Sequence, residues 1–305
     1  MSLALSSNLL WASDAGPEVP QYYPALFRRA DGFAHIEEID IFPPRSPKVT
    51  TRLTTFPLGF RFLTFGPDAS SIYFQATPTY GRPRDTNEQD YIAKWDLASL
   101  RSERVPGSEG IGQIRYLTVG SNIFVSGTLE SNARGVCGAY RLSRIGPADI
   151  LRQGQWPDCG GGAGPVSADG RYLISFSGTE WALLDLRSGA IAPLGSGLQW
   201  PAWSPDGRQL AVTGPGGTYV IDALTPKRRR RVAGSSVGPA IWSPDSKYLL
   251  VPHSQFSCAM MLYGGRTLAI VDVARRKTMN IPATHCTVTS ESYGWVRAEA
   301  LAEKP

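Results

Sequence analysis

Four cysteines, Cys137, Cys159, Cys258 and Cys286, have the most distinctive side-chain chemistry in this chain. Four cysteines allow three disulfide pairings, and disulfides would indicate an oxidising compartment. The alternative is four buried free thiols in a cytosolic protein. No two of them have the Cys-x-x-Cys spacing of a zinc site, so we predict no metal centre on them.

A second chemical candidate is Ser236, which lies at the centre of a G-x-S-x-G pattern at residues 234–238. In hydrolases with this pattern, the serine sits on a sharp turn between a strand and a helix, and an aspartate and then a histidine follow in the chain. Here the pattern falls between two expected strands. We interpret it as a linker.

The elements that position these residues are indicated by a repeated phrase. Residues 203–212, which begin Trp-Ser-Pro-Asp-Gly, recur at residues 242–251 with an offset of 39, and weaker copies lie at 65–74 and 166–174. Pro fixes φ for a turn, Asp can accept hydrogen bonds from amides two residues on, and Gly takes a positive φ. A repeat of about 40 residues with strand–turn–strand chemistry is typical of a β-propeller.

A second signature, apolar–Asp–apolar, counts the third strand of each blade. It occurs around Asp40, Asp96, Asp185, Asp222 and Asp272, and a strand at 138–142 fits the rhythm without the aspartate. Six third strands predict an all-β, six-bladed β-propeller. A seven-bladed ring, with one more blade hidden between residues 75 and 165, is the alternative.

We expect residues 1–305 to form a single propeller domain in which the two chain ends share one blade. Residues 1–59 give the outer strands of this blade, with a second strand near 8–12, and residues 290–305 give its inner strand, near 293–298, and a tail. Such a closure removes exposed strand edges.

The Trp-Ser-Pro-Asp-Gly phrase followed by apolar–Asp–apolar resembles the WD-like repeats of TolB-type propellers, over residues 60–290. The resemblance implies a six-bladed ring. Members of this family include a periplasmic protein-binding scaffold, the propellers of prolyl-oligopeptidase-like peptidases and sensor domains. The chain has no room for the hydrolase domain of such peptidases.

The repeat map narrows the pairing of the cysteines. Cys137 opens a third strand and Cys159 follows the outer strand of the same blade, while Cys258 and Cys286 hold analogous positions in another blade. We therefore predict disulfides Cys137–Cys159 and Cys258–Cys286. They would place the protein outside the cytoplasm, in the periplasm or secreted; with free thiols it would be cytoplasmic.

Metal and cofactor chemistry finds little support in the sequence. None of His35, His253 and His285 falls on an expected inner strand, where a channel metal would need its ligands. The repeated aspartates fit strand-end and turn roles. The glycine run at 160–164 lacks the Lys-Ser/Thr of a phosphate loop. We predict no metal and no cofactor.

Three long connections between second and third strands are the best candidates for a binding surface. They span about 15–33, 75–89 and 252–265, in blades that would be neighbours in the ring. Tyr, Arg and Met are enriched in interface cores. The alternative is that these loops pack on one another. The candidate contact residues are Tyr22, Tyr23, Phe27, Arg28, Arg29, Tyr80, Arg82, Arg84, Phe256, Met260, Met261 and Tyr263.

The net charge of +5 arises mainly from one run, residues 227–231, which reads Lys-Arg-Arg-Arg-Arg. We expect a solvated turn between a third and an outer strand, or else a docking patch for an acidic partner. No aromatic platform for single-stranded nucleic acid adjoins it. We expect no membrane span and no signal peptide in this chain.

These observations favour a non-catalytic, monomeric scaffold that binds a protein or peptide, without a nucleic-acid partner. One alternative is a propeller lyase or hydrolase with its site at the channel mouth. The other is the sensor domain of a larger membrane-anchored protein.

Overall fold

Twenty-four β-strands in six four-stranded antiparallel sheets make up the described part of the chain. The computed structural model describes residues 22–29, 36–41, 49–52, 60–76, 90–109, 111–129, 137–142, 149–154, 163–177, 180–234, 236, 238–254, 266–281 and 293–297. Within these ranges no helix is long and apolar enough to cross a membrane.

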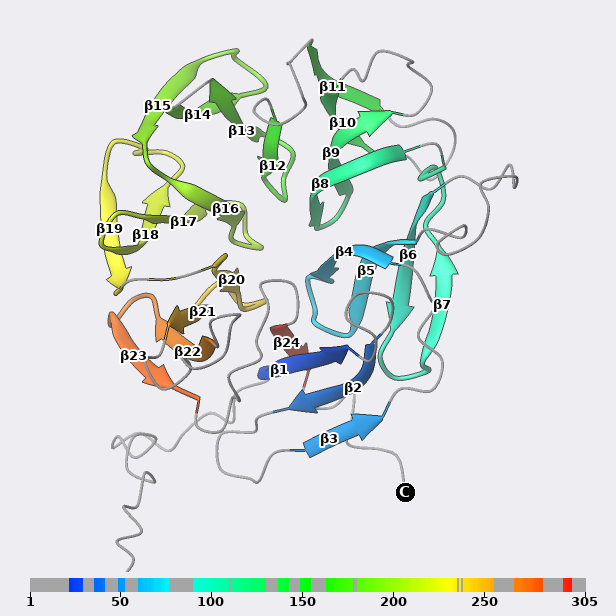
Figure 1. The fold of residues 1–305 in the computed structure, drawn as a ribbon. Helices are drawn as coiled ribbons and strands as arrows, with labels where there is room; N and C mark the ends of the chain where they lie inside the picture. The colour runs from blue at the N-terminus through cyan, green and yellow to red at the C-terminus, as the bar shows by residue number, and fades with distance from the viewer. Residues whose placement is uncertain are drawn as a thin grey trace, which may run out of the picture.

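The sheets are the blades of a ring (Figure 1). Blades 1–5 each take four consecutive strands, while blade 6 combines the last strand with the first three. From the inner strand outward, blade 1 consists of β4 (Phe60–Phe65), β5 (Ser71–Ala76), β6 (Tyr91–Asp96) and β7 (Arg101–Arg104), and blade 2 of β8 (Ile111–Val119), β9 (Ile123–Leu129), β10 (Cys137–Arg141) and β11 (Asp149–Gly154). Blade 3 consists of β12 (Ala163–Val166), β13 (Tyr172–Ser177), β14 (Glu180–Asp185) and β15 (Ile191–Ser196), and blade 4 of β16 (Gln199–Trp203), β17 (Gln209–Gly214), β18 (Gly217–Asp222) and β19 (Arg229–Ala233). Blade 5 consists of β20 (Ile241–Trp242), β21 (Tyr248–Ser254), β22 (Arg266–Asp272) and β23 (Lys277–Asn280), and blade 6 of β24 (Tyr293–Arg297), β1 (Tyr22–Arg29), β2 (Ile36–Ile41) and β3 (Val49–Arg52).

The predicted six-bladed propeller with one shared blade is confirmed. β24 pairs with β1, so the C-terminal strand is the inner strand of a blade whose other strands are N-terminal. All the described strands between residues 75 and 165 belong to blades 1, 2 and 3, so they supply no seventh blade.

The predicted second strand of the shared blade, near residues 8–12, is wrong. Those residues lie outside the described part of the chain, and the second strand is β1. Pro24 pairs with Trp295 inside this strand. A proline cannot donate a ladder hydrogen bond and argues against a strand in sequence reading, whereas here the pairing with β24 overrides that local signal.

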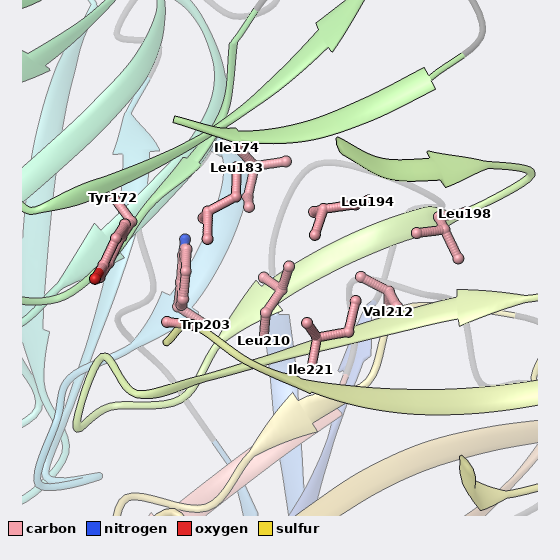
Figure 2. Close-up of a cluster of buried hydrophobic side chains, with 10 residues drawn as sticks. Tyr172, Ile174, Leu183, Leu194, Leu198, Trp203, Leu210, Val212 and Ile221 are labelled. Carbon is pink, nitrogen blue, oxygen red and sulfur yellow. The ribbon is translucent and has the colours of Figure 1, made fainter. Parts of the chain in front are cut away.

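Apolar packing between successive blades closes the ring. Six clusters of buried side chains lie among the described residues, one at each of the six blade–blade contacts, including the contact between blade 6 and blade 1. Figure 2 shows the cluster between blades 3 and 4. Its buried members are Tyr172, Ile174, Leu183, Leu194, Leu198, Trp203, Leu210, Val212, Ile221 and Ala223.

Indole hydrogen bonds tie several inner strands to the blade before them. In each case Nε1 of an inner-strand tryptophan donates to a backbone carbonyl of the preceding inner strand. The bonds run from Trp203 to Pro165 (3.0 Å), from Trp242 to Ala202 (3.0 Å) and from Trp295 to Ile241 (3.1 Å). In each case the accepting residue comes immediately before the residue that holds the tryptophan position in its own blade. The same bond therefore repeats from one blade to the next.

The contact between blade 6 and blade 1 uses a different fit. Phe65 occupies the tryptophan position of blade 1 and its ring lies directly on Gly294. A Cβ built on Gly294 would be 1.7 Å from Cε2 of Phe65. The amide of Arg297 also donates to the carbonyl of Ala69 at 3.0 Å, across the same contact.

The Ser-Pro-Asp-Gly turns are closed by their own side chains. In blade 4, the hydroxyl of Ser204 donates to Oδ1 of Asp206 at 2.6 Å and accepts from the amide of Gln209 at 2.9 Å. Gly207 has a φ of +70°, which glycine adopts without a steric cost. Equivalent bonds join Ser167, Asp169 and Tyr172 in blade 3 and Ser243, Asp245 and Tyr248 in blade 5.

We predict that Gly294→Ala prevents proper closure of the ring. The added methyl group would overlap the Phe65 ring, and overpacking of this kind costs about 3 kcal/mol of unfolding free energy. The measurement is urea unfolding followed by circular dichroism. Gly234→Ala is the matched control, because nothing lies within 4 Å of a Cβ built there. Equal urea midpoints for the two variants would contradict this account of closure.

We also predict that Trp203→Phe lowers the unfolding free energy by about 2 kcal/mol, because the carbonyl of Pro165 loses its donor and the core loses volume. Trp200→Phe, three residues away on an exposed side chain, should change it by less than about 0.5 kcal/mol. The same unfolding assay compares them, and similar losses in both variants would remove the indole bond as the cause.

Candidate functional site

The two ends of the ring have different chemistry. One end, called the turn end, carries the Ser-Pro-Asp-Gly turns and the turns from third to outer strands. The other, called the loop end, carries the connections from second to third strands. Because the turns recur nearly unchanged, their polar side chains are committed to structure, as in the bonds of Asp206 and Asp245.

The aspartates at the ends of the third strands also have structural roles. Oδ1 of Asp185 accepts from the amides of Arg187 and Ser188 at 2.9 and 3.1 Å. The amide of Ser99 donates to Asp96 at 2.6 Å, and the hydrogen bonds from Ser99 hold the pKa of Asp96 below its ordinary value. Asp96 and Asp185 are therefore ionised turn caps, which is the role predicted from their recurrence.

Five residues of the predicted binding wall do not lie in a loop. Strand β1 contains Tyr22, Tyr23, Phe27, Arg28 and Arg29. Tyr22 pairs with Arg297 near the turn end, while Arg29 pairs with Ile36 at the loop end. Seven steps along a strand separate the two ends of β1 by about 23 Å. The expectation that residues 22–29 lie in a long loop is wrong, because they form strand β1, and their role in binding stays a prediction.

The two tyrosines are part of the packing between blades. Both are half-buried, and Tyr22 packs against the cluster between blades 5 and 6. Tyr23 packs against the cluster between blades 6 and 1. Neighbouring side chains on a strand point to opposite faces, so Tyr22 packs toward blade 5 and Tyr23 packs toward blade 1.

The remaining wall residues, Tyr80, Arg82, Arg84, Phe256, Met260, Met261 and Tyr263, lie outside the described residues. The strands that flank them are described. β5 ends at Ala76 and β21 ends at Ser254, both at the loop end, in blades that stand on either side of blade 6. The segments 77–89 and 255–265 therefore depart from the same end of the ring.

Trp200 is an exposed residue at the loop end that sequence reading missed. It lies on inner strand β16, is 38% exposed and has a φ of +48°. A bulky residue rarely adopts this left-handed conformation. The equivalent positions of the repeat in blades 3 and 5 are Ala163 and Pro239, so a large aromatic residue breaking the repeat was the signal available in the sequence.

A β-bulge sets the backbone of Trp200. Gln199 pairs with Thr213 and Ala202 with Ala211, so three steps along β16 match two along β17. The inner strands of blades 2 and 3 have the same three-to-two register, between Ile111 and Ile114 and between Ala163 and Val166, so the bulge belongs to the repeat. The feature particular to blade 4 is the tryptophan that the bulge carries.

The segment before Trp200 is held from blade 3. Nε1 of Trp181 donates to the carbonyl of Leu198 at 2.6 Å, and the Trp181 ring packs on Phe176 with centroids 4.9 Å apart. Gly195 and Gly197 also have positive φ, at +93° and +71°, which glycine adopts without strain. The left-handed residue that carries strain is Trp200, and such strain persists where surrounding contacts over-determine the backbone.

Other candidates from the sequence have local structural explanations. The G-x-S-x-G pattern lies between β19 and β20, which confirms the linker interpretation, and the Ser236 hydroxyl is 2.9 Å from the carbonyl oxygen of Gly238. His253 is on second strand β21, while His35 and His285 lie outside the described residues. In the described ranges, no three His, Cys, Asp or Glu side chains gather as a metal site would require.

Of the cysteines, only Cys137 lies in the described part of the chain. It opens β10, as predicted for a third strand, and pairs with Gly154 at the end of β11. Cys159 follows five residues after Gly154. Cys159, Cys258 and Cys286 lie outside the described residues, so their pairing stays a prediction.

Comparison with known proteins shows the fold. No protein-family model and no curated protein matches the sequence. Among solved structures, TolB from Acinetobacter baumannii is 14% identical with a TM-score of 0.58, covering 92% of this chain and 67% of that one. An oligogalacturonate lyase in complex with manganese is 13% identical with a TM-score of 0.51, covering 89% and 81%. A putative TolB from Agrobacterium tumefaciens is 14% identical with a TM-score of 0.50, covering 86% and 88%. At these identities, the chain shares with them the β-propeller fold.

Proposed function

We propose that this chain is a non-catalytic, monomeric, single-domain propeller that binds a protein or peptide at its loop end. The observation that carries the proposal is Trp200, an exposed tryptophan on a bulged, left-handed stretch of an inner strand. Tryptophan is among the residues most enriched in binding hot spots. Neither folding propensity nor core packing explains a tryptophan at this position.

The surroundings of Trp200 support a peptide or protein ligand. The side chain is flanked by exposed Gln199 and by Pro201, and it is the one large exposed apolar residue at the loop end among the described residues. Segments 77–89 and 255–265 leave from the same end. They carry the Tyr, Arg, Phe and Met residues Tyr80, Arg82, Arg84, Phe256, Met260 and Tyr263, which we propose as further contacts.

The competing function is a propeller lyase or hydrolase, since an oligogalacturonate lyase shares the fold. Such an enzyme needs acid and base groups that converge on a substrate. At the loop end, Oδ2 of Asp90 accepts from Nε2 of Gln75 at 2.9 Å, and Oε1 of Gln75 lies 3.4 Å from the amide of Ile114. These bonds join blade 1 to blade 2, which is a structural use of the carboxylate.

We propose that the cysteines form the pairs Cys137–Cys159 and Cys258–Cys286, and that the protein acts outside the cytoplasm. The position of Cys137 at the start of a third strand, opposite the end of the outer strand that leads to Cys159, supports the first pair. Each bridge would join the outer hairpin of one blade to the connection that follows it.

Peptide mass mapping without reductant should therefore find both pairs and no other. Because each bridge closes a loop of about 20 to 30 residues, reduction should lower the unfolding free energy by about 3 kcal/mol for each. Thiol alkylation that labels all four cysteines of the unreduced protein would remove both the pairing and the extracytoplasmic location.

The binding proposal is tested with peptides selected from a random display library on the immobilised full chain. Trp200→Gly should weaken the selected peptides at least tenfold, because the hot-spot side chain is lost. The same change should raise the unfolding free energy by about 0.5 kcal/mol or leave it unchanged, because glycine adopts a φ near +48° without strain. Titration calorimetry and urea unfolding measure the two effects.

Ile191→Gly is the matched control, an exposed apolar residue away from the loop end that is 66% exposed. It should leave peptide affinity unchanged. Equal affinity of wild type and Trp200→Gly would refute the proposed site. Release of unsaturated products from oligogalacturonate by the wild type, lost on Trp200→Gly, would instead establish the enzyme.

A further inference from the structure

Basic side chains form a continuous band on the outer rim of blades 4 and 5. The turn after β18 and strand β19 supply five of them, and the turn after β22 and the first residue of β23 supply three. We call them the basic band: Lys227, Arg228, Arg229, Arg230, Arg231, Arg275, Arg276 and Lys277. In Figure 1, β19 (yellow) and β23 (orange) follow one another along the edge of the ring.

A direct contact joins the two halves of the band. Nη1 of Arg230 donates to the carbonyl of Val273 in the next blade. Arg230 is half-buried by this contact, while its neighbours Arg229 and Arg231 are exposed. Within the same run, Nε of Arg231 donates to the carbonyl of Ala233 at 3.3 Å, and the Arg229 guanidinium lies beside Gly195 of blade 3. Arg230 makes the contact with blade 5, while Lys227, Arg228, Arg229 and Arg231 stay exposed.

The band accounts for the positive charge of the whole protein. Residues 222–231 and 272–277 contain eight basic and two acidic residues, a net charge of +6, while the complete chain carries +5. The acidic pair is already engaged: Asp222 accepts from the amide of Leu224 at 2.8 Å, and Asp272 forms an ion pair with Arg275 at 3.2 Å. Among the described residues, no other member of the band forms an ion pair.

Protection of a sheet edge does not require this much charge. Lysine and other charged residues on outer strands prevent edge-to-edge pairing. Outer strand β7 is protected by side chains of both charges, and its Glu103 forms an ion pair with Lys94 at 3.4 Å. Outer strand β15 has no charged residue. In contrast, β19 begins with three consecutive arginines and contains no acidic residue.

An exposed leucine stands beside the band. Leu224 is 77% exposed, in the turn that leads to Lys227 and Arg228. The turn is fixed by hydrogen bonds from the amide of Thr225 to the carbonyl of Asp222 at 3.1 Å and from the amide of Arg228 to the carbonyl of Thr225 at 2.9 Å. The fold therefore holds an apolar side chain out in water, among cations.

We propose that the basic band and Leu224 form a docking surface for an anionic lipid bilayer. Lysine and arginine near a bilayer are attracted to acidic headgroups, and an apolar side chain beside them can enter the region below the phosphates. The convex rim suits a flat surface. Nucleic acid fits less well, because the band contains no aromatic side chain for base stacking and offers nothing that a leucine would contact.

The test is co-sedimentation of the full chain with vesicles of phosphatidylcholine alone or mixed with phosphatidylglycerol. Wild type should bind only the mixed vesicles, and binding should fall as NaCl rises from about 0.1 M to about 0.5 M. The triple variant K227Q/R228Q/R229Q should lose about 100-fold in partition coefficient. Arg230 is left intact in this variant because it supports the blade contact.

Two further variants separate the proposed surface from net charge and from a general polyanion site. R101Q/R187Q/R208Q removes the same charge from exposed positions outside the band and should keep most of the binding. Leu224→Ser, which changes no charge, should weaken vesicle binding about tenfold. Urea unfolding and circular dichroism verify that each variant is folded.

Three results would overturn the proposal. The first is equal binding of wild type to both kinds of vesicle. The second is an equal loss in the two triple variants, which would mean that net charge alone acts. The third is that the protein binds a DNA duplex as tightly as it binds mixed vesicles, and that Leu224→Ser weakens neither interaction. The band would then bind polyanions in general, without insertion of Leu224 into lipid.

Discussion

The ring depends on one repeated interaction between neighbouring inner strands. Three inner-strand tryptophans each place the indole Nε1 on a carbonyl of the blade before. The same side chains fill the apolar space between blades, so a single residue type supplies both the hydrogen bond and the packed volume. At the last contact Phe65 replaces tryptophan and loses the donor, and Gly294 compensates by allowing the ring to lie on bare backbone.

This constraint explains the difference between the two ends. The turns that follow the tryptophans must keep one conformation, so their serines and aspartates bond to one another and to nearby amides. The turns of adjacent blades also touch, as when the amide of Asp206 meets the hydroxyl of Ser246 at 3.3 Å. Little chemical freedom remains for a ligand in these Ser-Pro-Asp turns. In the described part of the loop end no such repeated network occurs, and connections of different length are tolerated there.

The outer rim of the ring is a third surface, where exposed side chains are little constrained by the closure of the ring. Outer strands contact the rest of the ring mainly through one face, so their exposed residues vary without disturbing the closure. In the run from Lys227 to Arg231, Arg230 bonds across to blade 5 and the other four residues remain exposed. Loop end and rim are thus separate surfaces of one rigid scaffold, and the proposed peptide site and the proposed lipid surface do not compete for the same residues.

The sequence by itself determined the strand–turn–strand repeat, the number of blades, the third strands and the sharing of one blade by the two chain ends. These follow from residues close together in the chain, because Pro, Asp and Gly set turns locally. Only the tertiary structure decided that Tyr22 and Tyr23 pack between blades and that Trp200 is exposed. Strand β1 is defined by pairing with β24, more than 260 residues away, and the bulge at Trp200 by its register against β17. Burial and register arise from contacts between distant segments, which no local pattern records.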